Sequence, residues 1–346
     1  MLLNEEEYSL FQCAYSITTG TEVVEHGLAT AVEGRTFPGE SGKRLRAGSL
    51  PQTIDTIGVI GAGTMGHGIA QVAAAAGYKV LLRDVDRDTL AHGIRAIERN
   101  LDKGMQLGKL TDADRENTLQ NIHGTTHLET LSSADLIIEA VPERLELKQT
   151  ILREVESLSS RQFIFASNTS SLSITDIATA SSRPERVVGM HFFNPVHLMR
   201  LLEIVVGKLT SAETVETVVE VGRRLRKEPI IVKDVPGFAS SRLGVAIGLE
   251  AMRMVEQGVA SAQDIDKAME LGYNHPVGPL KLTDIVGLDV RLNIAEYLHG
   301  ALDSEVFRPP QLLRRMVSEG KLGKKSGEGF YNWRDEKEDS RRAYSS

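Results

Sequence analysis

The stretch TIGVIGAGTMG, residues 56–66, decides the fold of this chain. Its first five residues are mostly apolar and run into glycines, which predicts a short buried strand. Gly61, Gly63 and Gly66 follow with the spacing G-x-G-x-x-G. An alanine-rich helix is expected next, from Met65 to Ala76. A strand that passes through such a turn into a helix is typical of the phosphate-binding corner of a doubly wound α/β domain.

The residues of this turn suit a dinucleotide. The first glycine permits the tight turn, the second lets a pyrophosphate approach the backbone, and the third lets the helix pack close to the strand. Thr64 and Met65 lead into the helix N-terminus, where N–H groups and a partial positive charge attract phosphates. Candidate cofactor-binding residues are therefore Gly61, Gly63, Thr64, Met65 and Gly66.

An acidic residue ends the next predicted strand. Asp84 lies 21 residues after Gly63, close to the ~20 expected before the carboxylate that binds the adenosine ribose. Such a carboxylate accepts hydrogen bonds from the ribose hydroxyls and repels a 2′-phosphate, which favours NAD over NADP. Arg83 and Arg87 flank Asp84 and weaken that preference. The alternative is that Asp84 only caps the following helix.

Strand and helix patterns alternate beyond this point. Six more apolar stretches indicate strands: YKVLLRD (78–84), DLIIEAVP (135–142), RQFIFASN (161–168), RVVGMHF (186–192), LLEIVVG (201–207) and PIIVKD (229–234). Helical patterns lie between them, beginning at 88 and covering 144–158 and 214–226. The alternation predicts a mostly parallel sheet with helices on both faces, a Rossmann-like domain over residues 53–235.

The pattern becomes helical after Val235-Pro236-Gly237. Helices are expected over 243–255, 265–271, 280–298 and 311–317, so residues 236–333 form an all-α domain. Residues 1–52 have no sustained period apart from a possible helix at 22–31, and 334–346 are a charged tail. We therefore expect two domains between an N-terminal extension and a tail.

Composition excludes several classes of protein. The chain has 346 residues, with 40 Lys and Arg against 47 Asp and Glu, a balance that argues against nucleic-acid binding. A single cysteine, Cys13, excludes an internal disulfide or a cysteine-clustered zinc site. The sequence has no apolar run of membrane-spanning length, and the first residues are acidic, unlike a targeting segment. We expect a cytoplasmic protein that binds neither membrane nor metal.

Polar residues follow two of the later strands. NTSS (168–171) and HFFNP (191–195) lie near carboxyl ends of strands, where ligands bind in open α/β sheets. His191 has a pKa suited to a general base beside a nicotinamide, and Glu203 in the next strand could orient it. From the pattern alone, Glu203 could equally face solvent on an edge strand, and a lone His191 is more often a core residue.

These residues resemble a known family. NTSSL, HFFNP, a glutamate twelve positions after the histidine, NHPVGPLKLTDIVGLD (274–289) and GKLGKKSGEGFYNW (320–333) together resemble the L-3-hydroxyacyl-CoA dehydrogenases, especially the stand-alone 3-hydroxybutyryl-CoA dehydrogenases. The resemblance covers residues 53–333. It implies the NAD-dependent interconversion of L-3-hydroxyacyl-CoA and 3-ketoacyl-CoA, in fatty-acid β-oxidation or butanoate metabolism.

The resemblance also implies roles for single residues. His191 is expected to be the general base and Glu203 its orienting carboxylate, while Ser170 hydrogen-bonds the substrate oxygen beside the nicotinamide. Asn194 is expected at both cofactor and substrate. Further expected contacts to the cofactor are Glu143, Lys148 and Lys325. By composition alone, the two lysines would be ordinary surface charges.

Two positions depart from the family pattern. Ser241 stands where an asparagine usually helps to hold the substrate, which predicts retained but altered activity. Asn100 and Leu107 replace a serine and a lysine that touch CoA in animal enzymes, so Asn100 is a candidate substrate contact. Lys103 or Lys109 is expected to serve the CoA phosphates instead.

Two alternatives remain open, and one partner is expected. A related dehydrogenase of free hydroxy acids fits the HFFNP segment less well, and a non-catalytic relative of the crystallin kind is at odds with the intact His191, Glu203 and Ser170. Apolar helix faces in a single helical domain predict a homodimer through that domain.

Overall fold

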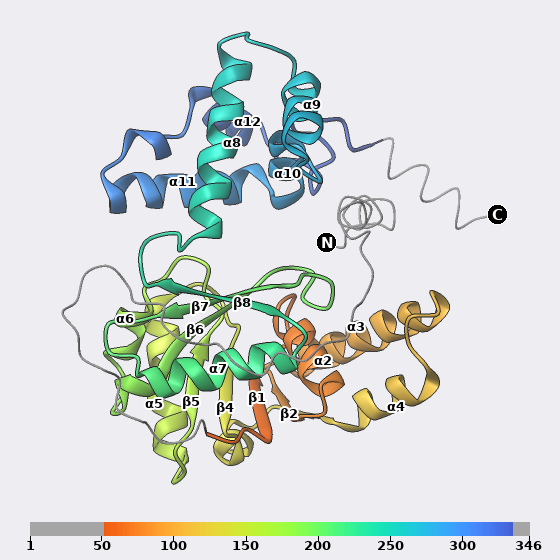
Figure 1. Ribbon diagram of the computed structural model, residues 1–346, viewed down its shortest axis with the longest axis vertical. Coiled ribbons are helices and arrows are strands. Elements are labelled where there is room, and N and C mark those ends of the chain that lie inside the picture. The colour runs from red at the N-terminus through yellow and green to blue at the C-terminus, as the bar shows by residue number, and fades with distance from the viewer. Residues whose placement is uncertain (1–51, 335–346) are drawn as a thin grey trace, which may run out of the picture.

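The computed structural model describes residues 52–334 of the chain (Figure 1). An eight-stranded sheet with the order β3-β2-β1-β4-β5-β6-β7-β8 forms its first part. The strands are β1 (Thr56–Ile60), β2 (Lys79–Arg83), β3 (Ile122–Thr125), β4 (Leu136–Glu139), β5 (Ile164–Ser167), β6 (Val187–Phe192), β7 (Leu201–Val206) and β8 (Glu228–Lys233). All neighbours pair in parallel except β6 and β7, which are antiparallel. This confirms the predicted mostly parallel α/β class.

Helices cover both faces of the sheet. They are α2 (Gly66–Ala75), α3 (Arg87–Gln106), α4 (Asp112–Gln120), α5 (Leu145–Leu158), α6 (Ile174–Ala178) and α7 (Ala212–Arg224), with the 3₁₀ turns η1 (Leu128–Ser133) and η2 (Pro184–Arg186). Ile57 and Val59 of β1 belong to a core that α2, α3 and α7 share, whereas Ile60 belongs to a second core with η1, α5 and α6. β1 and the strands β4, β5 and β6 are therefore buried on both sides, as parallel strands in α/β proteins usually are.

The strand order reverses next to the glycine turn. β1 lies between β2 and β4, so the chain leaves β1 at the point where the connections turn to opposite sides of the sheet. In open α/β sheets, ligands bind outside the carboxyl ends of the strands at this kind of switch point. The topology therefore places the glycine turn where a ligand is expected.

The second part of the chain is helical. It contains α8 (Ser240–Glu256), α9 (Ala262–Tyr273), α10 (Pro279–Val286), α11 (Leu288–Leu302), η3 (Glu305–Phe307) and α12 (Gln311–Ser318). These elements share a core of their own and lie together beyond the β7–β8 end of the sheet, reached through the start of α8 (Figure 1). The single helix predicted over 280–298 is wrong, because Gly287 adopts φ +107 and divides it into α10 and α11.

Buried carboxylates hold the last described segment against this core. Asp284 of α10 is fully buried and accepts hydrogen bonds from the backbone N–H groups of Phe330 and Tyr331 and from Trp333 Nε1. Asp266 of α9 accepts the Tyr331 hydroxyl at 2.7 Å. The GEGFYNW segment is therefore part of the helical core.

Residues 1–51 and 335–346, with the helix expected at 22–31 and most of the charged tail, lie outside the described residues. Within residues 52–334, no helix is long and apolar enough to cross a membrane. The same residues contain no group of His, Cys, Asp and Glu side chains that could hold a metal ion.

Candidate active site

The glycine turn after β1 has two crowded positions and one open position. Gly61 has φ +96, and a Cβ atom there would lie 2.7 Å from the carbonyl oxygen of Ala140. A Cβ atom on Gly66 would lie 1.6 Å from the carbonyl oxygen of Gly61. A Cβ atom on Gly63 would have no heavy atom within 4 Å. Only the middle glycine therefore faces space that a ligand can fill.

The helix that follows leaves its first turn available. α2 begins at Gly66, and within the described residues no side chain caps its N-terminus at Met65. The N–H of His67 donates to the Gly63 carbonyl, and Thr64 lies on the turn itself. N–H groups and the helix dipole at such an end favour an anion.

Asp84 lies beside this turn at the end of β2. Its Oδ2 accepts the Ala62 N–H at 2.8 Å and its Oδ1 accepts the Asp86 N–H at 3.1 Å. The alternative that Asp84 caps the next helix is wrong, because Asp86 caps α3 by accepting the Thr89 N–H. A half-buried carboxylate next to an open, glycine-lined helix end fits the ribose and the pyrophosphate of a dinucleotide.

His191 and Glu203 form a buried pair on neighbouring strands. They are direct partners in the antiparallel register of β6 and β7, and His191 Nδ1 lies 2.7 Å from Glu203 Oε2. His191 is 5% exposed and Glu203 is fully buried. The expectation that Glu203 might face solvent on an edge strand is therefore wrong: β7 lies between β6 and β8.

Glu203 is also held from the start of the helical part. Its Oε2 accepts the Ser240 hydroxyl at 2.7 Å, and its Oε1 accepts the N–H groups of Ser240 at 2.9 Å and Ala239 at 3.2 Å. Burial raises the pKa of this carboxyl, but hydrogen bonds from His191 and Ser240 outweigh burial and leave the pKa below its ordinary value. Glu203 is therefore an ionised partner for the imidazole.

The second nitrogen of the imidazole points to a hydroxyl. His191 Nε2 lies 3.2 Å from Ser170 Oγ, and Ser170 is exposed on the loop after β5. The rings of Phe193 and Phe238 pack on the imidazole, with centroids 4.6 and 5.8 Å from its own. Contacts on both nitrogens and on the ring fix the orientation of His191.

Glu143 holds the loop that carries Ser170. Its Oε1 accepts the N–H groups of Ser170 and Ser171 at 3.1 Å each, together with the hydroxyl groups of Thr169 and Ser171. Burial raises the pKa of Glu143, but the Lys148 charge and these hydrogen bonds outweigh burial and lower it. Glu143 is thus ionised beside the loop that carries Ser170.

Lys148 is buried beneath Glu143 rather than exposed. Its side chain is 1% exposed, and its Nζ lies 2.7 Å from Glu139 Oε1 and 3.3 Å from Glu143 Oε2. Glu139, which is fully buried at the end of β4, also accepts the Ser167 hydroxyl and the Val141 N–H at 2.7 Å each. The view of Lys148 as an ordinary surface charge is therefore wrong.

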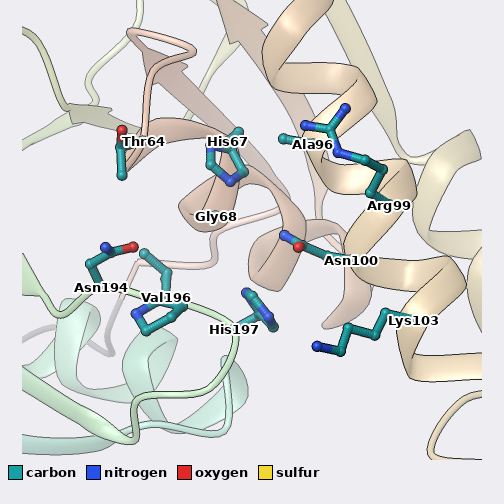
Figure 2. A pocket seen from close by; sticks show the side chains of 11 residues that line it. Thr64, His67, Gly68, Ala96, Arg99, Asn100, Lys103, Asn194, Val196 and His197 are labelled. Atoms are coloured by element: carbon teal, nitrogen blue, oxygen red, sulfur yellow. The ribbon is translucent and has the colours of Figure 1, made fainter. Parts of the chain in front are cut away.

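A cavity of about 290 Å³ lies between α2, α3 and the loop after β6 (Figure 2). Eleven residues line it: Thr64, His67, Gly68, Ala96, Arg99, Asn100, Lys103, Asn194, Pro195, Val196 and His197. Asn100 also donates from its amide to Gln71 of α2 at 3.0 Å. Asn194 and Asn100, two predicted substrate contacts, thus share one cavity with Lys103. Lys109 is not among its lining residues.

Two other predicted residues lie in the helical part. Ser241 is half-buried in the first turn of α8, directly after the Ser240 that binds Glu203. Lys325 Nζ lies 2.6 Å from Asp289 Oδ2 at the start of α11, and its side chain is 37% exposed. The structure therefore gives Lys325 a partner within the helical part.

Sequence reasoning missed several residues of the site. Ser240, which binds Glu203, directly precedes the predicted Ser241, so its place after the Val235-Pro236-Gly237 turn was the signal that could have identified it. The signal for Glu139 is its position inside the apolar run of residues 135–142, where an acid is costly without a partner. No sequence pattern identified His67, Arg99 or His197 as part of a site.

Comparison with known proteins divides the chain between the sheet and the helical part, as the structure does. The models of the 3-hydroxyacyl-CoA dehydrogenase NAD binding domain and C-terminal domain match residues 56–235 and 237–333. A probable 3-hydroxybutyryl-CoA dehydrogenase of Deinococcus radiodurans is 47% identical over 276 residues, 80% of this chain and 99% of the relative. The human mitochondrial hydroxyacyl-coenzyme A dehydrogenase is 43% identical over 284 residues, 80% of this chain and 90% of that protein.

Solved structures agree with these matches. The crystal structure of (S)-3-hydroxybutyryl-CoA dehydrogenase from Ralstonia eutropha is 41% identical, with a TM-score of 0.79, and the match covers 81% of this chain and 99% of that one. The sheet with its glycine turn is thus an NAD-binding domain, and the chain belongs to the 3-hydroxyacyl-CoA dehydrogenase family of oxidoreductases.

Proposed function

We propose that this protein interconverts an L-3-hydroxyacyl-CoA and the corresponding 3-ketoacyl-CoA with NAD as the hydride carrier. One observation carries the proposal: Glu203 holds the His191 imidazole with its Nε2 3.2 Å from Ser170 Oγ. β1, β4, β5 and β6 are parallel neighbours, so this pair and the glycine turn lie at the same carboxyl edge of the sheet. The family membership supports the same chemistry.

The residues of the chain supply acid–base chemistry and orientation. NAD, when bound, accepts or returns a hydride at its nicotinamide ring. His191 Nε2 takes the hydroxyl proton of the substrate, and Ser170 hydrogen-bonds the same oxygen. Glu203 accepts from Nδ1–H and so fixes the tautomer that leaves Nε2 free to act as base, and its charge offsets that of the imidazolium. In the reverse direction, the imidazolium returns the proton to the keto oxygen.

We assign two different roles to Glu143 and Lys148. Glu143 orients the 169–171 loop and lies at the surface where the cofactor is expected. Lys148 is a positioning residue, because its ammonium is buried against Glu139 and Glu143. Asp84 beside the glycine turn favours NAD over NADP, and steady-state rates with NADH and NADPH test this preference.

The cavity of Figure 2 is the place we propose for part of the CoA moiety. It opens between the glycine turn and the loop after His191, and it contains Asn100, Lys103 and Asn194. Its cationic side chains suit a ligand that carries phosphates. Ser241 in the first turn of α8 lies next to the Glu203 partner and is proposed to contact the acyl part.

The helical part is proposed to bind a second copy of the chain. Leu271 and Tyr273 at the end of α9 are 84% and 76% exposed. Exposed apolar side chains that lie close together on a surface favour a contact with a partner. Light scattering of the purified protein tests the homodimer. Three further points stay predictions: that Lys325 contacts the cofactor, that the protein is located in the cytoplasm, and that it acts in fatty-acid or butanoate metabolism.

The decisive experiment compares substrates. We expect the full chain to oxidise NADH with acetoacetyl-CoA and to do so much more slowly with free acetoacetate, because only the thioester can use the cavity. Equal or faster turnover of free acetoacetate would favour a hydroxy-acid dehydrogenase. No NADH oxidation with either compound would favour a non-catalytic relative.

A further inference from the structure

Two histidines face the cavity of Figure 2 from different elements. His67 lies in the first turn of α2, and His197 lies on the loop after β6. Figure 2 shows both imidazoles around the same space as the side chains of Arg99 and Lys103, which come from α3. None of the described residues that line this cavity is acidic. The cavity therefore concentrates positive charge and groups that can become positive.

A buried lysine supports the loop that carries His197. Lys227 is 7% exposed, and its Nζ donates to the carbonyl oxygens of Val196 and Met199. Burial lowers the pKa of Lys227 to about 8. The ammonium thus lies behind the wall of the cavity and adds to its positive potential.

The surroundings keep both imidazoles neutral until an anion arrives. Burial lowers the pKa of His197 to about 4, and positive charge on His67 when it is protonated, on Lys227 and on Lys103 lowers the pKa further. Burial also lowers the pKa of His67; Arg99 lowers it further, and the hydrogen bond to the Gly63 carbonyl opposes this. A phosphate dianion in the cavity reverses the balance, because an opposite charge favours the protonated form.

We propose that His67 and His197 are a proton-linked recognition pair for the phosphate groups of the CoA substrate. This inference rests on the proposed function and adds to it the way in which the CoA moiety is recognised. Binding of the phosphates draws a proton onto the pair, and release of the product returns it to solvent. The affinity for CoA therefore rises as the pH falls, by about 3- to 10-fold per pH unit for half to one linked proton.

Calorimetry in two buffers that differ in protonation enthalpy measures the linked protons directly. We titrate the full chain, saturated with NAD, at pH 7 with CoA, 3′-dephospho-CoA, pantetheine and inorganic phosphate. The inference predicts proton uptake with CoA, less with dephospho-CoA, and none with pantetheine. Uptake with inorganic phosphate as well would support recognition through the phosphate groups. In a separate titration of the chain without NAD, proton uptake on binding NAD together with none on binding CoA would overturn the assignment to CoA.

Variants separate the pair from the titration of the ligand itself. His67→Gln and His197→Gln are each expected to reduce the uptake with CoA and to raise the KM for acetoacetyl-CoA more than they lower kcat. His92→Gln is the matched control: His92 makes the same contact to the carbonyl four residues earlier but is exposed on α3, outside the cavity. It should behave as the unmodified chain.

The outcomes keep this inference apart from the proposed function. Suppose that acetoacetyl-CoA is reduced, but proton uptake in both glutamine variants equals that of the unmodified chain, or is equal for CoA and pantetheine. The inference about the recognition pair is then wrong, and the proposed activity stands. If acetoacetyl-CoA is not reduced at all, the proposed function itself fails.

Discussion

His191 and Glu203 lie directly opposite each other on the antiparallel strands β6 and β7, with Nδ1 2.7 Å from Oε2. Strand pairing, rather than a flexible loop, fixes this distance, so the imidazole keeps one orientation without substrate. The pair is antiparallel in a sheet that is otherwise parallel. The reversal brings a residue twelve positions along the chain next to Nδ1 of the imidazole.

Replacement of the carboxylate tests what it does for the histidine. Glu203→Gln is nearly isosteric, but its amide can donate to Nδ1 and so favour the wrong tautomer. We expect kcat to fall by about 10²-fold or more, within the range that general-base assistance supplies. The measurement is the rate of NADH oxidation with acetoacetyl-CoA. Ser240→Ala keeps the carboxylate and should cost less; an unchanged kcat in Glu203→Gln would show that the acid has no part in proton transfer.

Glu203 also predicts how stability depends on pH. Despite burial, hydrogen bonds from His191 and Ser240 hold its pKa in the folded protein below the ordinary value of 4.5. The contribution of Glu203 to the free energy of unfolding is therefore complete above that ordinary value. It is lost as the pH falls through the folded-state pKa. Urea unfolding from pH 7 to 3 should show a smaller loss of unfolding free energy for Glu203→Gln. Glu216→Gln, on the exposed side of α7, is the control; curves parallel to the unmodified chain in both variants would contradict the prediction.

The glycine turn predicts two contrasting alanine variants. Gly63→Ala meets no heavy atom within 4 Å, so we expect its stability to change by less than about 1 kcal/mol. The added methyl group occupies the space of the pyrophosphate, so the Kd for NAD should rise about tenfold or more. Gly66→Ala places a methyl group 1.6 Å from the Gly61 carbonyl and should destabilise the fold. Thermal unfolding and NAD titration test both; unchanged NAD affinity in Gly63→Ala would remove the cofactor from this turn.

Lys148 predicts a large effect from a residue that does not face solvent. Lys148→Met leaves the buried Glu139 without its cation, so we expect a loss of about 3–5 kcal/mol in the free energy of unfolding. NAD should also bind more weakly, because Glu143 loses its ion pair. The double variant Glu139→Gln/Lys148→Met should recover part of the stability. If both variants are as stable as the unmodified chain, Lys148 is not a positioning residue.

Features that depend on residues close together in the chain could be predicted from the sequence. The strand, glycine spacing and Asp84 predict the dinucleotide corner because each follows from backbone geometry within some thirty residues. The alternating apolar patterns predicted the α/β class. These features depend on neighbours in the chain.

The environments of Glu203 and Lys148 could not be predicted from the sequence, because they depend on how the strands and helices are arranged in the fold. The face of Glu203 is set by β6 on one side and β8 on the other, and strand order cannot be read from periodicity. From its composition Lys148 would be a surface charge, because its partners, the buried Glu139 and the partly exposed Glu143, are brought to it only by the fold. The break at Gly287 was missed because its apolar neighbours continue a helical pattern through the bend.

The most direct measurement of the central claim is the turnover of His191→Gln with NADH and acetoacetyl-CoA. Glutamine can accept and donate hydrogen bonds near Ser170 and Glu203 but cannot serve as the base. We predict that kcat falls by about 10²–10⁴-fold while NAD binds with unchanged affinity. Turnover within a few-fold of the unmodified chain would contradict the account, because the proton would then have to travel by another route.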